Sequence, residues 1–364
     1  MSDDAGQPVL ALNVGSSSLK FGLFMAGPGD SRVLFSGAEE MAGEPQAAVA
    51  RIAERIAARG LPMPAAVGHR IVHGGPQCRQ HTLIDAAVMQ QLQAATAFAP
   101  LHLPPALALV RAAQARFPGI AQVACLDTAF HSGMPTVART LPIPRELRAL
   151  GIERYGFHGL SGESILRQLG NDLPPRLVIA HLGHGASVTA VAHGASVDTS
   201  MGLTPSGGVI MSTRCGDIDP GVLAYVVREH AYHAAQLEAL IDQRSGMLGI
   251  SGLSGDLREL NAAAASTSGS ANDAQLAITM FCSSVRKQIA AMAVVLGGVD
   301  LLVFTGGIGE NDASTRGLIW KGLEVLGIQK PMTRVFPAQE EEQIAWLTSQ
   351  LTKPPKAMTS LEIA

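Results

Sequence analysis

Residues 177–200 read LVIAHLGHGASVTAVAHGASVDTS, in which two apolar runs enclose a glycine-rich turn, 181-HLGHGAS-187. The short apolar runs predict two strands, and a further strand pattern follows them. Near the start of the chain, 9-VLALNVGSSSLKFGLF-24 has the same order of strand, polar turn and strand. The similar placing of the two turns predicts two related halves, each opening with a hairpin whose turn faces a ligand.

The rest of the chain alternates between helix and strand patterns. Helices are expected where apolar residues recur at helical spacing, and strands where short apolar runs end in glycine or polar residues. The predicted helices are 46–60, 84–100, 105–119 and 273–298, and the predicted strands lie within 31–40, 65–75, 121–135 and 300–311. This alternation is typical of the α/β class. Because the pattern restarts after about residue 150, we expect one domain over 1–150 and a second over 151–344.

Composition and charge argue against several classes of protein. The net charge of the 364 residues is −3 and the lysines and arginines are scattered, so no basic face for nucleic acid is expected. Four cysteines, far apart and without a CxxC pair, are expected to be reduced thiols. The N-terminus is acidic where a signal peptide needs positive charge, and no apolar run reaches the roughly 18 residues that span a bilayer. We therefore expect a cytoplasmic protein that binds neither nucleic acid nor membrane.

Three loops are suited to phosphate, because their small residues let backbone N–H groups approach oxygen atoms. They are 13-NVGSSSLK-20, 181-HLGHGAS-187 and 305-TGGIGEN-311. The first adds serine hydroxyls and the charge of Lys20, and the third follows a buried strand, where open α/β sheets bind ligands. None of the three has the spacing GxGxxG and the chain contains no GxxxxGK[ST], so neither a Rossmann nor a P-loop site is expected.

Other loops carry side chains that stabilise anionic transition states. Arg70, His158 and Arg214 each lie in a glycine-rich loop and not on a helical face. Asp127 directly follows a predicted strand, as a metal ligand or general base would, and His102 interrupts an apolar run. Such a set suits phosphoryl transfer, which asks mainly for positioning and for positive charge around the transferred group.

The chain resembles the acetate kinase family, of the acetate and sugar kinase, Hsp70 and actin superfamily. The matching motifs stand in the family's order and cover residues 9 to about 330: NVGSSSLK, GHRIVHGG, APLHLPP, LDTAFHSGMP, RYGFHGLSG, HLGHGAS, DTSMGLTP, STRCGDIDPG, SGLSGDLREL and FTGGIGEN. The resemblance implies a two-domain, ribonuclease H-like α/β fold with a duplicated mixed-sheet core, in which residues from about 345 to 364 pack back on the first domain. It also implies a homodimer that transfers a phosphoryl group reversibly and in line from ATP to acetate, giving ADP and acetyl phosphate, with Mg²⁺ or alternatively Mn²⁺.

The resemblance also implies roles for individual residues. Metal binding falls to Asn13 and Asp127, catalysis to Asp127, His158, Arg214 and Arg70, and the acetate carboxylate to Arg70. The pocket for the methyl group would comprise Val72, Leu101, Phe157 and Pro205. The nucleotide would contact Ser16, Ser18 and Lys20 along its phosphates, His181, Leu182, Gly183, His184 and Gly185 around a phosphate, and Asp256, Leu257, Arg258, Gly307, Ile308, Gly309, Glu310 and Asn311 at the nucleoside end.

Two features depart from the family pattern. His184 replaces the asparagine of HLGNGAS, but the glycines remain, so we expect retuned nucleotide binding and not its loss. The family ends in a segment like PTNEEL, whose glutamate reaches magnesium, whereas here Thr359 and Ser360 stand at those positions and Glu362 is out of register. Three interpretations therefore remain: an active acetate kinase, a nucleotide-binding protein of this fold with impaired catalysis, and a propionate or butyrate kinase. Val72 favours acetate, because a smaller residue would leave more room.

Overall fold

The computed structural model describes residues 6–15, 18–27, 29, 31–40, 44–267, 269–328 and 332–353. The chain forms two compact units. The first comprises the described parts of Met1–Leu126 and Glu340–Ala364, and the second comprises those of Asp127–Gln339. The first unit is therefore built from both ends of the chain. The domain division that we expect at residue 150 stays a prediction.

The first unit contains a six-stranded mixed sheet with the order β3-β2-β1-β4-β6-β5. Its elements are β1 (Gln7–Val14), β2 (Ser18–Ala26), β3 (Ser31–Glu40), α1 (Pro45–Ala57), β4 (Ala66–Ile71), β5 (Thr82–Leu83), α2 (Ala86–Ala94), a 3₁₀ turn (Ala95–Phe98), α3 (Leu103–Arg116), β6 (Ala121–Leu126) and α14 (Glu340–Thr352). Strands β1, β2 and β3 form an antiparallel meander, and β4 and β6 continue the sheet parallel to β1. The hairpin predicted for 9–24 is thus confirmed.

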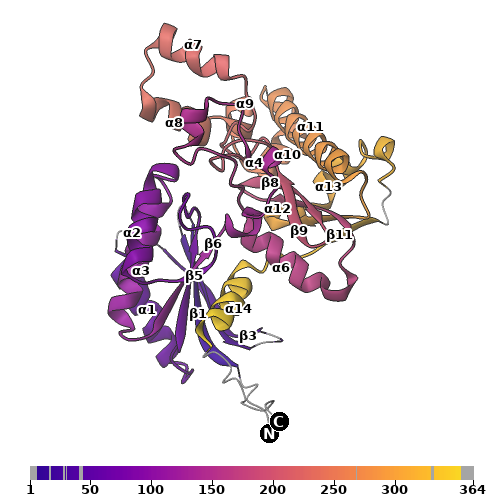
Figure 1. Cartoon of the computed structure of the whole chain (residues 1–364). Helices are drawn as coiled ribbons and strands as arrows, with labels where there is room; N and C mark the ends of the chain where they lie inside the picture. Colours follow the sequence, from indigo (N-terminus) through magenta and orange to yellow (C-terminus); the bar gives the residue numbers. More distant parts are fainter. Residues whose placement is uncertain are drawn as a thin grey trace, which may run out of the picture. The chain divides into compact units, whose positions relative to one another are not determined.

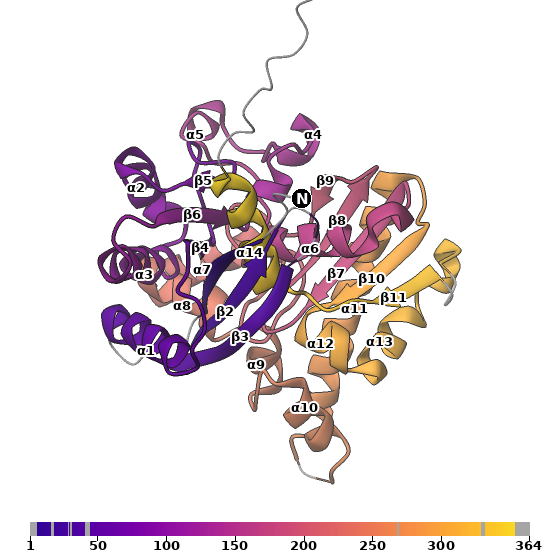
Figure 2. The ribbon, with the colours of Figure 1, turned by 90° about the horizontal axis from the view of Figure 1, so that it is seen from below.

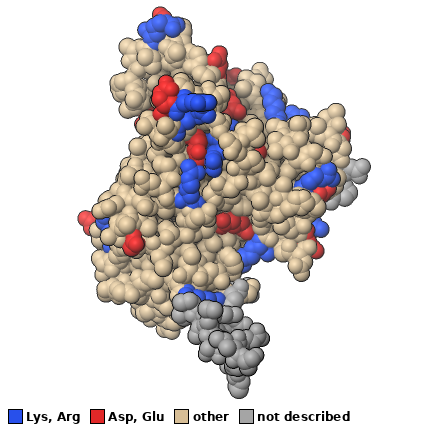
Figure 3. Space-filling view, in the orientation of Figure 1, with Lys and Arg blue, Asp and Glu red and all other residues tan. Residues whose placement is uncertain are grey.

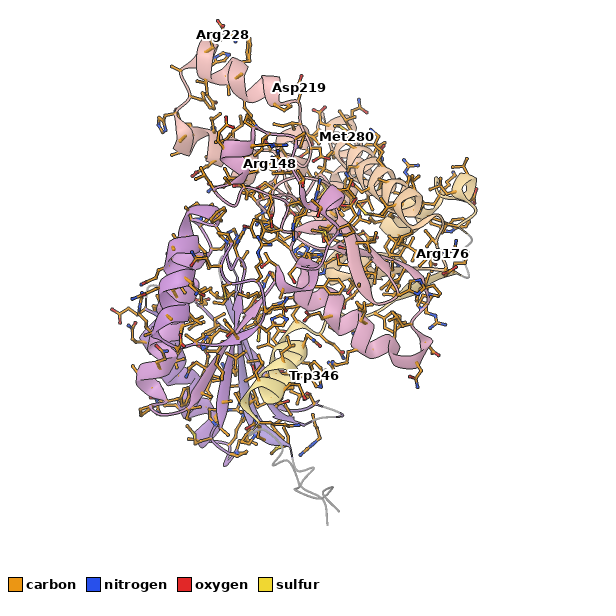
Figure 4. The ribbon with its side chains drawn as sticks, viewed as in Figure 1. Arg148, Arg176, Asp219, Arg228, Met280 and Trp346 are labelled. Carbon is orange, nitrogen blue, oxygen red and sulfur yellow. The ribbon has the colours of Figure 1, made fainter. Side chains whose placement is uncertain are left out.

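Helices cover both faces of the first sheet. Figures 1 and 2 show α1 and α3 on one face and α14 on the other. Strand β1 is buried from Val9 to Val14, as expected for a strand that is covered on both sides. On the side of α14, a Cβ added at Gly68 of β4 would lie 2.2 Å from the hydroxyl of Thr348, so only glycine lets this helix come so close. Figure 4 shows Trp346 on α14.

The second unit contains a five-stranded mixed sheet with the order β11-β10-β7-β8-β9. Its first elements are two 3₁₀ turns (Ala129–His131 and Gly170–Asp172), α4 (Thr136–Arg139), α5 (Arg145–Arg148), α6 (Gly159–Leu169), β7 (Arg176–Leu182), β8 (Ala186–Ala192) and β9 (Ala195–Thr199). There follow α7 (Pro220–His230), α8 (Ala234–Gln243), α9 (Gly246–Ser251), α10 (Leu257–Ala264), α11 (Ala271–Leu296), β10 (Leu301–Thr305), α12 (Gly306–Asn311), α13 (Ala313–Trp320), a 3₁₀ turn (Glu324–Leu326) and β11 (Thr333–Val335).

The second sheet is also covered on both faces. Ile165 and Leu169 of α6 pack against Leu177, Ile179 and Val303 of the sheet, and α11 packs against β7, β8 and β9. Figure 1 shows these two helices on opposite sides of the strands. Among the described residues, α11 is the one helix that is long and apolar enough to cross a membrane by length and composition. Its contacts with the sheet are those of a core helix.

The two sheets share one pattern of strands. In the order β3-β2-β1-β4-β6 and again in β9-β8-β7-β10-β11, two antiparallel pairs are followed by two parallel pairs. Each sheet therefore begins with a three-stranded meander whose first strand also pairs with a parallel strand. The predicted α/β fold with a duplicated mixed-sheet core is confirmed.

Charged side chains are sparse on the surface. On the face shown in Figure 3, lysine and arginine alternate with aspartate and glutamate among mostly uncharged residues. In the second unit, Arg176 at the start of β7 pairs with Asp300 before β10, with Nε and Oδ2 3.1 Å apart (Figure 4). This ion pair lies at the end of the sheet opposite to the two glycine-rich loops, because β7 and β10 are parallel.

Candidate active site

A cavity of about 970 Å³ lies in the second unit. Three segments to which the resemblance assigns the nucleotide line it together, contributing Gly183, His184, Asp256, Leu257, Arg258, Gly307, Ile308 and Asn311. Further lining residues, which the sequence analysis did not name, are Ser212, Thr213, Gly255, Asn261 and Asp312. Each of these residues lies within a few positions of a residue that the sequence analysis named. Their closeness to the motifs in the sequence could therefore have predicted them.

The cavity lies where two parallel strands end. Strands β7 and β10 are neighbours and pair in register up to Thr305 and His181, so the turn 183–185 and the start of α12 meet at one edge of the sheet. The segment 305–311, expected as a loop, thus forms a short helix after Thr305. Gly306 has a φ of +78°, and an added Cβ would lie 2.7 Å from the carbonyl oxygen of Leu182. A glycine is therefore required there for both its backbone conformation and its close approach to β7.

The loop 181–187 is a tight turn. The N–H of Gly183 donates to the carbonyl of Gly185 at 2.9 Å, and the N–H of Ser212 donates to the carbonyl of His184 at 3.4 Å. Partial burial of the His184 ring, and next the charge of Arg214, lower the pKa of this imidazole. Its usual pKa is already below 7, so His184 is neutral at neutral pH and adds no positive charge for a phosphate.

His158 is held in a strained position beside this loop. It has a left-handed conformation with a φ of 59° immediately before α6, and the N–H of the following Gly159 donates to the backbone carbonyl of Asp127 at 2.9 Å. The His158 ring stacks on that of His181, with centroids 4.1 Å apart. Non-glycine residues in this conformation are uncommon and concentrate at functional sites.

Arg214 reaches the same loop from the segment that connects β9 to α7. Its Nη1 donates to the carbonyl of Pro205 at 3.3 Å. A Cβ added at Gly185 would lie 3.2 Å from Nε2 of His158 and 3.3 Å from Nη1 of Arg214. The structure thus brings the predicted imidazole and guanidinium close to the same glycine of the loop 181–187.

A second polar cluster lies in the first unit. The amide of Asn13 donates to Glu340 at 3.0 Å and to Glu341 at 2.8 Å, and its oxygen accepts from Nη1 of Arg70 at 3.1 Å. Arg70 also lies 4.0 Å from a carboxylate oxygen of Glu340. Strands β1 and β4 are neighbours in the sheet, and this places Asn13 and Arg70 side by side. Arg70 therefore lies near the end of a strand and not, as expected, in a glycine-rich loop.

The two glutamates beside Asn13 correct an expectation from the sequence. The expectation was that the family's glutamate pair is replaced by Thr359 and Ser360, with Glu362 out of register, so that the metal has lost a carboxylate; these three residues lie outside the described part of the chain. Glu340 and Glu341 instead begin α14. The sequence does contain a feature that predicts this helix start: the acidic run 340-EEE-342 stands ahead of an apolar stretch.

The remaining predicted residues are distributed over both units. Lys20 is exposed and pairs across the first hairpin with Asn13, the carbonyl of Ser18 accepts from Gly15, and Ser16 lies outside the described residues. In the first unit Val72 is buried and Leu101 exposed, and in the second Phe157 is buried and Pro205 partly buried. Asp127 is fully buried at the start of the second unit. Leu182 and Gly309 are buried, and a carboxylate oxygen of Glu310 accepts from the N–H groups of Gly306 and Ala338.

A comparison with known families accounts for this arrangement. A profile described as "Acetokinase family" matches residues 41–352. The chain belongs to the acetokinase family. The loop 181–187, His158 and Arg214 beside it, and the cluster around Asn13 are therefore parts of an acetokinase fold.

Individual acetokinases resemble this chain over most of their length. "Acetate kinase 2" of Neisseria meningitidis serogroup B is 44% identical over 314 residues, which cover 79% of this chain and 78% of that protein. Among solved structures, a propionate kinase from Francisella tularensis has a TM-score of 0.86 at 33% identity and covers 95% of this chain and 100% of that one. The Porphyromonas gingivalis acetate kinase has a TM-score of 0.82, also at 33% identity, with the same coverage.

Proposed function

We propose that this acetokinase transfers a phosphoryl group reversibly between ATP and acetate, giving ADP and acetyl phosphate. The observation that carries the proposal is that Nε2 of His158 and Nη1 of Arg214 both approach Gly185, next to Gly183 and His184, which line the cavity. Phosphoryl transfer needs donors and positive charge placed around the transferred group and little covalent chemistry from the protein. The similarity to "Acetate kinase 2" supports acetate as the acceptor.

The cavity of the second unit would hold ATP or ADP. The backbone of the loop 181–185 and of 307–309 would face the phosphates, because glycines there leave N–H groups accessible. Asp256, Arg258 and Asn311 would lie toward the nucleoside end, since all three line the cavity. Arg214 and His158 would then donate to the oxygens of the transferred phosphoryl group.

The cluster around Asn13 fits the Mg²⁺ that the family implies. The two carboxylates are hard oxygen ligands of the kind that Mg²⁺ prefers, and the ion keeps several waters besides. The Asn13 amide turns its nitrogen toward them and its oxygen toward Arg70. Among the described residues, no three or more histidine, cysteine, aspartate or glutamate side chains gather into a metal site, which is consistent with an ion that one or two carboxylates and a substrate phosphate hold. We assign the ion to Asn13 and Asp127, with Glu340 and Glu341, which contact Asn13, as the alternative carboxylates and Mn²⁺ as an alternative ion. The bound ion would neutralise charge on the phosphates.

Arg70 would bind the carboxylate of acetate, since a guanidinium can hold a carboxylate through two parallel hydrogen bonds. Val72, Leu101, Phe157 and Pro205 would contact its methyl group. One extra methylene changes binding in such a pocket by only about 1–3 kcal/mol. Propionate is therefore the second candidate acceptor, and the similarity to the Francisella propionate kinase favours testing it. Homodimer formation and a cytoplasmic location belong to the same proposal.

The decisive assay is ATP formation from ADP and acetyl phosphate with Mg²⁺, for the protein and for Arg214→Ala. We expect robust activity that the substitution abolishes. Activity no higher than that of Arg214→Ala, with ADP still bound, would favour a nucleotide-binding protein with impaired catalysis. In the direction of ATP consumption, a kcat/KM for propionate above that for acetate would reassign the acceptor.

A further inference from the structure

The stacked histidines of the second unit are held by two buried serines. His158 Nδ1 lies 2.9 Å from Oγ of Ser187, and His181 Nδ1 lies 2.9 Å from Oγ of Ser161. Both serines are almost completely buried, with 2% and 1% of their surface exposed. Each ring is therefore fixed through the same nitrogen atom by a hydroxyl group that water does not reach.

The fold explains why Ser187 meets His158. Ser187 of β8 is the cross-strand partner of His181 in β7, so the two side chains lie on one face of the sheet. The ring of His158 stacks on His181 and thereby comes within reach of the hydroxyl of Ser187. Its other nitrogen, Nε2, lies on the side of the ring that faces Gly185 and Arg214.

Two neighbours of the His158 ring disfavour a positive charge on it. The ring lies face to face with another imidazole, and its Nε2 shares the neighbourhood of Gly185 with the guanidinium of Arg214. A second cation there would be repelled at short range. A neutral imidazole carries one proton, on either Nδ1 or Nε2, and the hydrogen bond at one nitrogen decides which.

We propose that Ser187 is a positioning residue that donates its hydroxyl proton to Nδ1 of His158 and so keeps the ring proton on Nε2. A neutral His158 would then present an N–H to the transferred phosphoryl group without needing to be charged. Ser161 does the same for His181, whose Nε2 faces Gly306 at the nucleotide cavity. The inference rests on the proposed function for its kinetic consequence, but the position of the ring proton does not depend on it.

The kinetic test compares two matched variants. Ser187→Ala should lower kcat about tenfold to hundredfold, as the loss of a hydrogen bond that fixes a functional imidazole does, and leave the KM for ADP within about twofold. Ser161→Ala should instead raise the KM for ADP, since His181 lies beside the nucleotide loops. Ser187→Thr, which keeps a hydroxyl group, should restore kcat. Ser164→Ala removes an equally buried hydroxyl of α6 that accepts from Gln168 and should change neither constant.

A spectroscopic test shows directly which ring nitrogen of His158 carries the proton. In protein labelled with ¹⁵N-histidine, long-range ¹H–¹⁵N spectra should show His158 protonated on Nε2. Ser187→Ala should shift His158 toward a mixture of both forms while His181 stays unchanged. A kcat for Ser187→Ala within twofold of the parent, or an unchanged His158 proton position, would overturn the proposal. If the parent has no kinase activity, the proposed function fails, and the spectra alone decide the role of Ser187.

Discussion

Gly185 lies close to the side chains of both His158 and Arg214, and the space for a methyl group there is tight. The added Cβ of Gly185→Ala would be 3.2 and 3.3 Å from their nitrogens, closer than most real contacts. Either side chain must move by a few tenths of an ångström, and small displacements of positioned groups can cost up to about a hundredfold in rate. We expect kcat to fall about tenfold to hundredfold with the thermal stability nearly unchanged, measured by initial rates and by thermal denaturation.

A matched control for this substitution exists in α13. No atom lies within 4 Å of a Cβ added at Gly317, and alanine is favoured over glycine inside a helix by about 0.5–1 kcal/mol. Gly317→Ala should therefore stabilise the protein slightly and leave kcat unchanged. Equal losses of activity in both variants would show that the effect at Gly185 is not local.

His184 is the residue at which the phosphate loop differs from the family pattern. The neutral ring brings bulk but no charge to the cavity, because burial and Arg214 lower its pKa. His184→Asn should bind ATP about threefold more tightly, an effect the size of one modest hydrogen bond. Isothermal titration calorimetry at pH 7.5 measures it, and an unchanged Kd would show that the histidine does not affect nucleotide binding.

The first turn of α14 brings carboxylates to Asn13. If these hold the metal ion, Glu340→Gln and Glu341→Gln should each raise the Mg²⁺ concentration for half-maximal activity by about tenfold, since each removes a negative charge beside the ion. Glu342→Gln alters the same helical turn and serves as the control, with a change of less than about twofold. Identical effects in all three variants would point to helix destabilisation, and no effect in the first two would remove the metal assignment.

The elements differ in how far the sequence could predict them. The hairpins β1–β2 and β7–β8 and the helix α11 were predicted because short-range periodicity determines them. The glycines of 181–187 and 305–311 marked two of the segments that line the cavity, whereas Asp256 to Arg258 came from the resemblance alone. The sequence did not predict the contact between Asn13 and Glu340, because 327 positions separate them and only the packing of α14 on β1 and β4 brings them together. The short strand β5 was missed as well, since two residues carry no periodicity.

The stability of the whole molecule should depend on two buried histidines, one in each unit. His69 is paired with Gln122, and His131 lies between Ser196 and the carbonyl of Phe157. Burial lowers the pKa of each to about 4 from 6.5. The unfolded chain therefore binds more protons between pH 6.5 and 4, so the free energy of unfolding should be constant above pH 6.5 and fall as the pH drops toward 4.

Urea denaturation at a series of pH values measures how the free energy of unfolding changes with pH. His69→Gln retains an amide that can donate to Gln122 but cannot titrate, so the decrease in stability between pH 6.5 and 4 should become smaller in this variant. Asp256, whose pKa Arg258 lowers to about 2, affects stability in a lower pH range. Its ionised carboxylate stabilises the folded state, and this stabilisation is lost only as the pH falls below about 4. A slope that is unchanged by His69→Gln would show that this histidine is not the group responsible.

The return of α14 to the first unit has a consequence for biosynthesis. A ribosome completes β1 to β6 early, but the helix that covers one face of this sheet belongs to the last part of the message. One apolar face of the nascent first unit therefore stays uncovered while the whole second unit is translated. Chaperones that bind exposed apolar strands would meet this intermediate, and a stop codon after residue 339 would leave it permanently incomplete.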